Sequence, residues 1–165
     1  MMLHPNIRVF VSHKQEDSAT ATEIAGRLQM NGLAFYLDVV DALEIKDGPD
    51  LGDYLRQQLG RCTQLLAIVS HATQQSWWVP WEIGVASEKE YPLATYLISP
   101  SAIPSYLRKW PYLQSLADVD SYCDVSKKVD QTLNESVTRG VTVEAARHDS
   151  FRSFHRMLKS ELRQE

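Results

Sequence analysis

The sequence predicts an α/β fold in which a parallel sheet of about five strands has helices on both faces. Two observations lead to this prediction. Short, continuous apolar runs, typical of strands that are buried on both faces, recur along the chain. They alternate with segments whose apolar residues recur at helical spacing, and this alternation is the chain order of parallel sheets. The length of 165 residues suits one domain with a sizeable core.

The first strand is predicted at residues 7–12, because the run I-R-V-F-V-S is β-branched and aromatic with few charges. A helix is predicted from about residue 17 to residue 30, where Ile24 and Leu28 belong to one apolar stripe. The pair Asn31-Gly32 is a typical helix end.

The middle of the chain supplies three more strands and two helices. Asp38 closes the second strand and begins a long loop. Asp50 is a candidate N-cap, and Gly60 a candidate end, for the short helix after that loop. The predicted elements are a strand at 33–37, a helix at 51–59, a strand at 64–70, a helix at 76–90 and a strand at 93–99.

The last third of the chain begins at Pro100 and Pro104, which interrupt regular structure. In the last helix, apolar residues again recur at helical spacing. The predicted elements are a short helical or irregular piece at 106–110, a weak strand near 113–119, a helix at 122–137 and an amphipathic helix at 150–162. Together these elements predict the strand order of flavodoxin-like sheets.

Composition narrows the function classes. A net charge of -4 with no basic tract argues against a nucleic-acid partner. No apolar run approaches the roughly 20 residues of a membrane span. The two cysteines, Cys62 and Cys123, and the five scattered histidines show no metal-ligand spacing. We therefore expect a cytoplasmic protein with reduced cysteines, no metal, no cofactor and no membrane contact.

Polar residues follow three of the predicted strands. The carboxyl ends of parallel strands meet at one edge of a sheet, which is where such sheets bind ligands. This polarity brings together residues that are far apart in the sequence. The residues expected near that edge are Ser12, His13, Lys14, Asp38, Trp78 and Glu82.

The stretch S-W-W-V-P-W-E-I at 76–83 places Glu82 among three tryptophans. A carboxylate against aromatic surface is poorly solvated, and such groups collect at functional sites. A second interpretation is structural. If Pro80 is the first helical residue, Glu82 lies in the first turn and faces the positive end of the helix dipole, while Trp77 and Trp81 pack in the core.

Three motifs in order resemble Toll/interleukin-1 receptor (TIR) domains. The run R-V-F-V-S-H-K-Q-E-D at 8–17 resembles the first strand of that family and its polar exit. The run F-Y-L-D at 35–38, with its long following loop, resembles the second strand and the so-called BB loop. The stretch at 76–83 resembles the helix of enzymatic members. The resemblance implies a TIR domain at residues 1–140, and residues 141–165 form an expected helical extension packed on it.

Enzymatic TIR domains cleave NAD at the nicotinamide–ribose bond, by hydrolysis, cyclisation or base exchange. Their helix carries Ser-x-Trp-x-x-x-Glu, which corresponds here to Ser76, Trp78 and Glu82. The resemblance therefore implies that Glu82 is catalytic and that NAD is a substrate. A lone acid suits this chemistry, because nicotinamide leaves as a neutral molecule and needs no general acid.

The other candidate substrate-binding residues each have a structural interpretation as well. Ser12 and His13 either bind phosphates or lie in a solvated loop. Lys14 either meets the pyrophosphate or is a surface lysine. Asp38 either contacts substrate or caps the loop that it begins. Tyr36 and His71 are weaker candidates.

Two departures from the family pattern matter. Pro80 removes a backbone donor near the start of the catalytic helix. The loop after Asp38 lacks the Arg-Asp-x-x-Pro-Gly motif of animal adaptors, which favours a stand-alone bacterial NADase.

The resemblance makes a role in antiphage defence plausible, with a cyclic ADP-ribose-type product sensed by a downstream effector and with self-association through TIR surfaces. The alternatives are a non-catalytic TIR module acting by self-association and a nucleoside deoxyribosyltransferase-like enzyme.

Overall fold

The computed structural model describes residues 6–39, 50–73, 78–99 and 104–165. Its centre is a five-stranded parallel sheet with the strand order β2-β1-β3-β4-β5. This confirms the predicted fold class and strand order. The strands are β1 (Arg8–His13), β2 (Ala34–Val39), β3 (Gln64–Val69), β4 (Leu93–Leu97) and β5 (Tyr112–Leu113).

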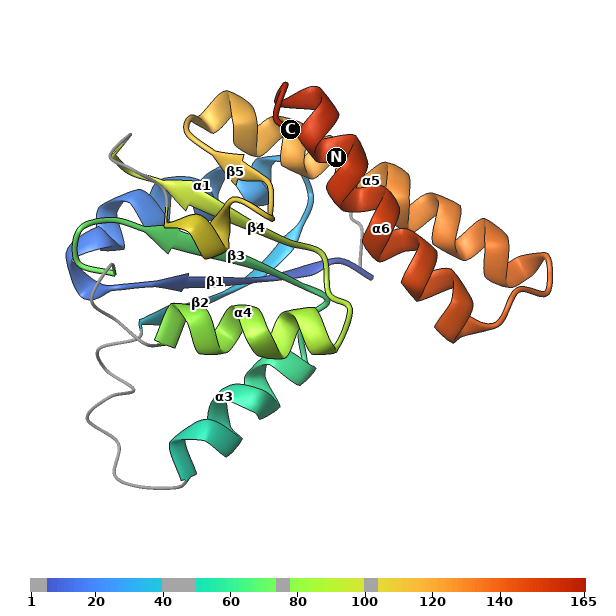
Figure 1. Ribbon diagram of the computed structural model, residues 1–165, viewed down its shortest axis with the longest axis horizontal. Helices are drawn as coiled ribbons and strands as arrows, with labels where there is room; N and C mark the ends of the chain where they lie inside the picture. The colour runs from blue at the N-terminus through green and yellow to red at the C-terminus, as the bar shows by residue number, and fades with distance from the viewer. Residues whose placement is uncertain (1–5, 40–49, 74–77, 100–103) are drawn as a thin grey trace.

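Helices lie on both faces of the sheet (Figure 1). One layer, made by α1 and α5, shares a buried cluster with the sheet, and the other layer, made by α3 and α4, shares a second cluster. The helices are η1 (Gln15–Asp17), α1 (Ser18–Met30), α3 (Asp50–Gly60), α4 (Trp78–Glu88), η2 (Ser105–Leu107), α5 (Leu116–Thr138) and α6 (Val143–Glu161).

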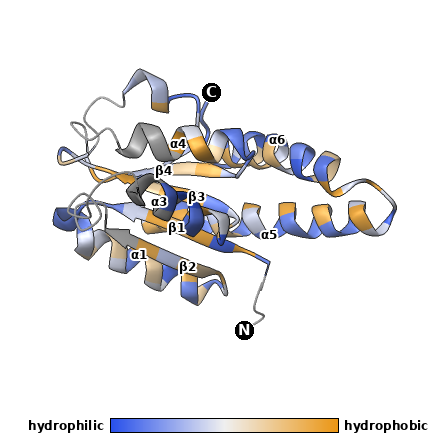
Figure 2. Ribbon diagram, turned by 90° about the horizontal axis from the view of Figure 1, so that it is seen from below, coloured by the Kyte–Doolittle hydropathy of each residue, from blue (hydrophilic) through white to orange (hydrophobic). Residues whose placement is uncertain are grey.

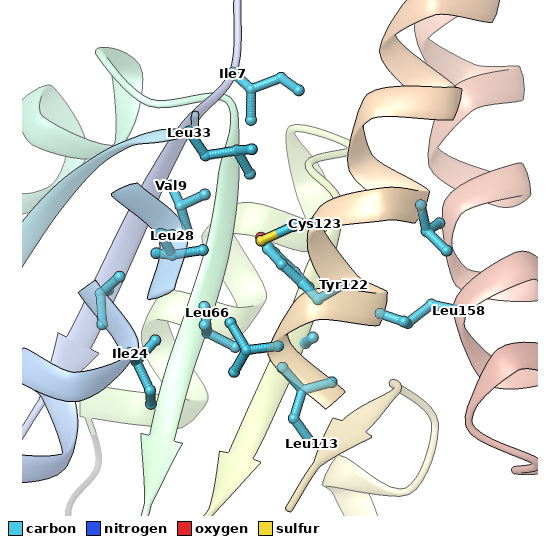
Figure 3. Close-up of a cluster of buried hydrophobic side chains, with 14 of the residues drawn as sticks. Ile7, Val9, Ile24, Leu28, Leu33, Leu66, Leu113, Tyr122, Cys123 and Leu158 are labelled. Atoms are coloured by element: carbon cyan, nitrogen blue, oxygen red, sulfur yellow. The ribbon is translucent and has the colours of Figure 1, made fainter. Parts of the chain in front are cut away.

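Alternation along the strands divides the core into these two clusters. Val9 and Leu66 point toward α1 and α5, where they meet Leu28 and Tyr122 (Figure 3). Phe10, the neighbour of Val9, belongs to the cluster on the α3 and α4 side. Burying each such side chain stabilises the folded state by about 1.5–3 kcal/mol, so packing on both faces holds the sheet in place.

Helix α1 is joined to α5 by a charged contact. Arg27 donates from Nε and Nη2 to the two carboxylate oxygens of Asp120 at 2.8 and 2.6 Å, and Asn31 donates to the same carboxylate at 3.0 Å. Hydrogen bonding from Arg27 holds the pKa of Asp120 below its ordinary value. This forked geometry fixes the relative position of the two helices that cover one face.

Helix α5 begins at Leu116, and this corrects the predicted strand at 113–119 and helix start at 122. Ser115 is the N-cap, and its Oγ accepts a hydrogen bond from the backbone N–H of Asp118 at 3.1 Å. The Asp118 carboxylate accepts in return from the N–H of Gln114 at 2.8 Å. This reciprocal capping outweighs the weak strand propensity of the segment and leaves β5 only Tyr112–Leu113.

Helix α6 begins at Val143, well before the predicted residue 150, because Thr142 caps it. It runs beside α5 (Figures 1 and 2). Phe154 and Leu158 on α6 are fully buried in the cluster around Tyr122. At the end of the chain, Gln164 pairs with both backbone polar groups of Tyr112, so α6 and the residues after it contact the sheet. No helix in the described part of the chain is long and apolar enough to cross a membrane.

Candidate functional site

The carboxyl edge of the sheet is where the sequence places the candidate site. Ser12 and His13 are the last two residues of β1, and Ser12 lies opposite Asp38 in the register of β1 with β2. Asp38 is a residue of β2, which ends at Val39, so it does not close the strand as predicted. The parallel register therefore brings Ser12 and Asp38 to neighbouring positions.

Ser12 and His13 are buried, with 0% and 3% of their surface exposed, so the solvated-loop interpretation is wrong for both. Strand alternation puts them on opposite faces. Ser12 shares the face of Phe10, which meets α3 and α4, while His13 shares the face of Val11, which meets α1. Of the two side chains, Ser12 alone faces the layer that contains α4.

A row of small side chains crosses the sheet on the α4 side. Ser12 lies opposite Ala67 of β3, which lies opposite Thr95 of β4. The hydroxyls of Ser12 and Thr95 are buried without a hydrogen-bond partner in the described part of the chain. Burying a hydroxyl without a hydrogen-bond partner lowers the stability of the fold by about 1–3 kcal/mol. A protein that keeps such a group often uses it in another way, for example to bind a ligand. Sequence reasoning missed Thr95, whose signal is a hydroxyl within the buried run L-A-T-Y-L.

At the same edge of the sheet, Asp17, Ser70 and Thr73 form a hydrogen-bonded group that the sequence analysis missed. Asp17, 7% exposed, accepts a hydrogen bond from Ser70 Oγ at 2.6 Å. Thr73 Oγ1 accepts from the N–H of Ser70 at 2.7 Å and donates to the Ser70 carbonyl at 2.8 Å. These bonds tie η1 to the turn after β3 and hold the first residues that follow this strand. The signal in the sequence is the spacing Ser-x-x-Thr directly after a buried strand.

Helix α4 begins at Trp78, so Pro80 is its third residue. A proline costs little there, because the first turn of a helix has no internal acceptors for its N–H groups. Glu82 follows one full turn after Trp78, on the same side of the helix. The dipole effect fades within the first turn, so helix-start stabilisation explains Glu82 less well than the sequence suggested.

The sheet side of α4 is marked by Ile83 and Ala86, which are buried against β3 and β4. Helix α4 therefore covers the face of the sheet that carries Ser12 and Thr95. Position 82 lies one turn before Ala86. Ser76 and Trp77 lie outside the described residues, and Trp78 and Glu82 are described here by their backbone alone.

Lys14 follows β1 directly, and its side chain is half-buried. Its carbonyl accepts a hydrogen bond from the N–H of Asp17 at 2.9 Å, which closes η1. The described residues contain no group of three or more His, Cys, Asp or Glu side chains that could hold a metal ion.

The chain was compared with solved structures, with curated proteins and with models of protein families. Two solved structures are similar to this chain at low sequence identity. A diflavin flavoprotein A3 from Nostoc sp. is 13% identical over 96% of this chain and 95% of its own, with a TM-score of 0.46. The TIR domains of the activated Roq1 resistosome that recognises the pathogen effector XopQ are 14% identical over 95% of this chain and 98% of theirs, with a TM-score of 0.44. Comparison with curated proteins gives no match.

A family model described as TIR domain matches residues 9–137, which include β1 from its second residue, the other four strands and α4. The match spans most of the chain, from β1 nearly to the end of α5, and the strand order agrees with it. This chain belongs to the TIR domain family.

Proposed function

We propose that this TIR domain cleaves the nicotinamide–ribose bond of NAD, as a NAD glycohydrolase or ADP-ribosyl cyclase, with Glu82 as the catalytic carboxylate. The TIR family includes both NAD-cleaving enzymes and signalling scaffolds. The observation that carries the proposal is the place of Glu82, one turn into the helix that follows the central strand β3. That helix covers the sheet face where Ser12 stands beside the position of Asp38.

The chemistry requires little beyond one well-placed negative charge. Nicotinamide departs from a pyridinium as a neutral molecule, so the leaving group needs no proton. What remains is a ribose with oxocarbenium character, which a carboxylate stabilises when water is largely excluded. Trp78, on the same side of α4 as Glu82, is proposed to stack on a ring of the substrate.

The other proposed contacts with the substrate come from residues at the carboxyl edge of the sheet. Ser12 is proposed to present its buried hydroxyl to the substrate from below α4, beside Asp38. Lys14, at the start of η1, is proposed to meet the pyrophosphate, and Ser76 to assist at the start of the catalytic helix. The side chain of His13 lies on the other face, so we assign it a backbone contribution only.

In this proposal the protein is a cytoplasmic enzyme with no bound cofactor, and NAD is its substrate. It self-associates through TIR surfaces, and its product is a cyclic ADP-ribose-type signal for a downstream effector in bacterial antiphage defence. Each of these features extends the NAD-cleaving proposal and depends on it.

The decisive experiment incubates concentrated protein with NAD and identifies the products by chromatography with mass detection. Glu82→Gln keeps the shape of the side chain and removes its charge, so nicotinamide release should fall by ~10²-fold or more. Glu88→Gln, at an exposed position on the same helix, is the matched control and should release nicotinamide at the wild-type rate. If wild type and Glu82→Gln release nicotinamide equally slowly, the protein is a non-catalytic TIR module acting by self-association.

A further inference from the structure

A cavity of about 380 Å³ lies at the opposite edge of the sheet from the candidate active site. It is formed where β1 and β3 begin, and it is enclosed by α5, α6 and the turn between α4 and β4. Figure 1 shows α5 and α6 beside these amino ends of the strands. Its volume is within the range of small-molecule sites. Helix α6, which lies outside the matched family residues, supplies one wall.

The floor of this cavity carries a fixed hydrogen-bond acceptor. Gln64 lines the cavity with only 4% of its surface exposed. Its Nε2 donates to Tyr122 Oη at 2.7 Å and to Ser126 Oγ at 2.8 Å. These two bonds orient the amide, and its Oε1 accepts no hydrogen bond from the part of the chain that is described. An acceptor that is held in this way and is not sealed from solvent is available to a ligand that carries a hydrogen-bond donor.

The walls of the cavity are aromatic. Phe151 of α6 and Tyr91 of the α4–β4 turn line it, and Phe154, which has none of its surface exposed, packs behind this wall. Phe154 is held edge-on against Tyr122, with ring centroids 5.6 Å apart at 85°, and Phe151 is held against Trp110 at 5.9 Å. Rings fixed in this way favour a flat, ring-shaped ligand.

The mouth of the cavity offers positive charge. Arg147 is exposed at the mouth and forms no ion pair with the described residues. Lys89 also lines the cavity, with its Nζ 5.9 Å from the centre of the Tyr91 ring. The Glu90 carboxylate is engaged by His148 Nδ1 at 3.0 Å, and Asp130 of α5 also lines the cavity. The mouth thus offers an exposed guanidinium that can bind an anionic group.

We propose that this cavity binds a nucleoside monophosphate, with an N–H group of the base on Gln64 Oε1, the base between the aromatic walls and the phosphate on Arg147. The proposal is independent of NAD cleavage, because it concerns another edge of the sheet and a different set of residues. A ligand seated there would bridge the TIR core and α6.

The test is calorimetric titration of the full chain with adenosine monophosphate and with adenosine. Adenosine monophosphate should bind saturably with one site and a dissociation constant below about 1 mM. Arg147→Glu should weaken adenosine monophosphate by about tenfold or more and leave adenosine unchanged. Gln64→Met should weaken both ligands. Arg152→Glu, an exposed charge reversal elsewhere on α6, should bind both like wild type.

Two results would overturn the proposal. One is the absence of saturable binding for the monophosphates of adenosine, guanosine, cytidine and uridine. The other is binding that Arg147→Glu leaves unchanged, or that Glu82→Gln abolishes, since either would place the nucleotide outside this cavity. Arg147 is exposed, so its variant decides the matter even where Gln64→Met fails to fold.

Discussion

The Thr95 hydroxyl is buried beneath α4 and has no hydrogen-bond partner among the described residues. Thr95→Val replaces it by a methyl group of the same shape, so the free energy of unfolding should rise by about 1 kcal/mol. If the hydroxyl serves the proposed substrate, nicotinamide release should fall at the same time. Thermal unfolding and NAD turnover, measured on the same samples, test both effects. Thr95→Ser keeps the hydroxyl and should retain activity; a Thr95→Val protein that gains stability with unchanged turnover would remove Thr95 from the site.

Residue positions along strands were the most predictable feature of the candidate site. Strand polarity alone indicates that Ser12 and Asp38 end up beside each other, because parallel strands in register end at one edge. The face that each side chain occupies depends on which helix covers it. That dependence is why sequence reasoning grouped His13 with Ser12, although the two side chains point to opposite faces.

At the scale of elements, His155 connects α6 to the sheet. Its Nε2 accepts a hydrogen bond from the N–H of Leu93 at 3.1 Å, and it packs against Trp110 with ring centroids 4.9 Å apart. Burial lowers the pKa of His155 from 6.5 to about 4, and the nearby Lys159 and Lys109 also disfavour its protonation. The neutral imidazole is therefore the form that the folded protein holds.

The sign of the resulting pH dependence follows. Between pH 6.5 and 4 the unfolded chain binds a proton at His155 and the folded protein does not, so stability falls as the pH is lowered through this window. The full loss is roughly 3 kcal/mol. Denaturant unfolding at pH 7 and pH 4.5 should show a smaller difference for His155→Gln than for wild type, while His71→Gln, at an exposed position in the turn after β3, should behave like wild type. An equal pH dependence in all three proteins would contradict this assignment.

The starts of α5 and α6 show where sequence reasoning about elements fails. The hydrophobic spacing used for prediction was recognised only from residues 122 and 150, whereas the helices begin earlier, directly after capping residues. Ser115 and Thr142 supply those caps, and both are visible in the sequence as hydroxyls before a helical segment. Attention to caps would have moved both predicted starts toward the observed ones.

At the scale of the whole molecule, alternation was enough to predict the sheet, because each strand is buried by its neighbours and by two helix layers. The cavity at the amino edge could not be predicted in the same way. It depends on the amide of Gln64 meeting hydroxyls of α5 that are 58 and 62 residues away, and on the path of α6 past the strand ends. No local sequence pattern predicts these long-range contacts.

The last prediction concerns α6 as part of this molecule. Its Phe154 and Leu158 are fully buried in the cluster that contains Tyr122, and removing a buried Phe alone costs about 3–5 kcal/mol. Deleting residues 148–165 should therefore lower the melting temperature sharply and expose apolar surface on α5, which favours association. Calorimetry and sedimentation of the truncated and full chains measure both effects.

Phe154→Ala and Arg156→Ala form a matched pair for this prediction, since the first residue is buried and the second is exposed on the same helix. Phe154→Ala should unfold at a lower temperature but in one cooperative step, as expected if α6 and the sheet form one folding unit. Arg156→Ala should match wild type. A truncated chain that melts and sediments like the full chain would make α6 an independent appendage. The aromatic wall of the cavity would then have no stable attachment to the sheet.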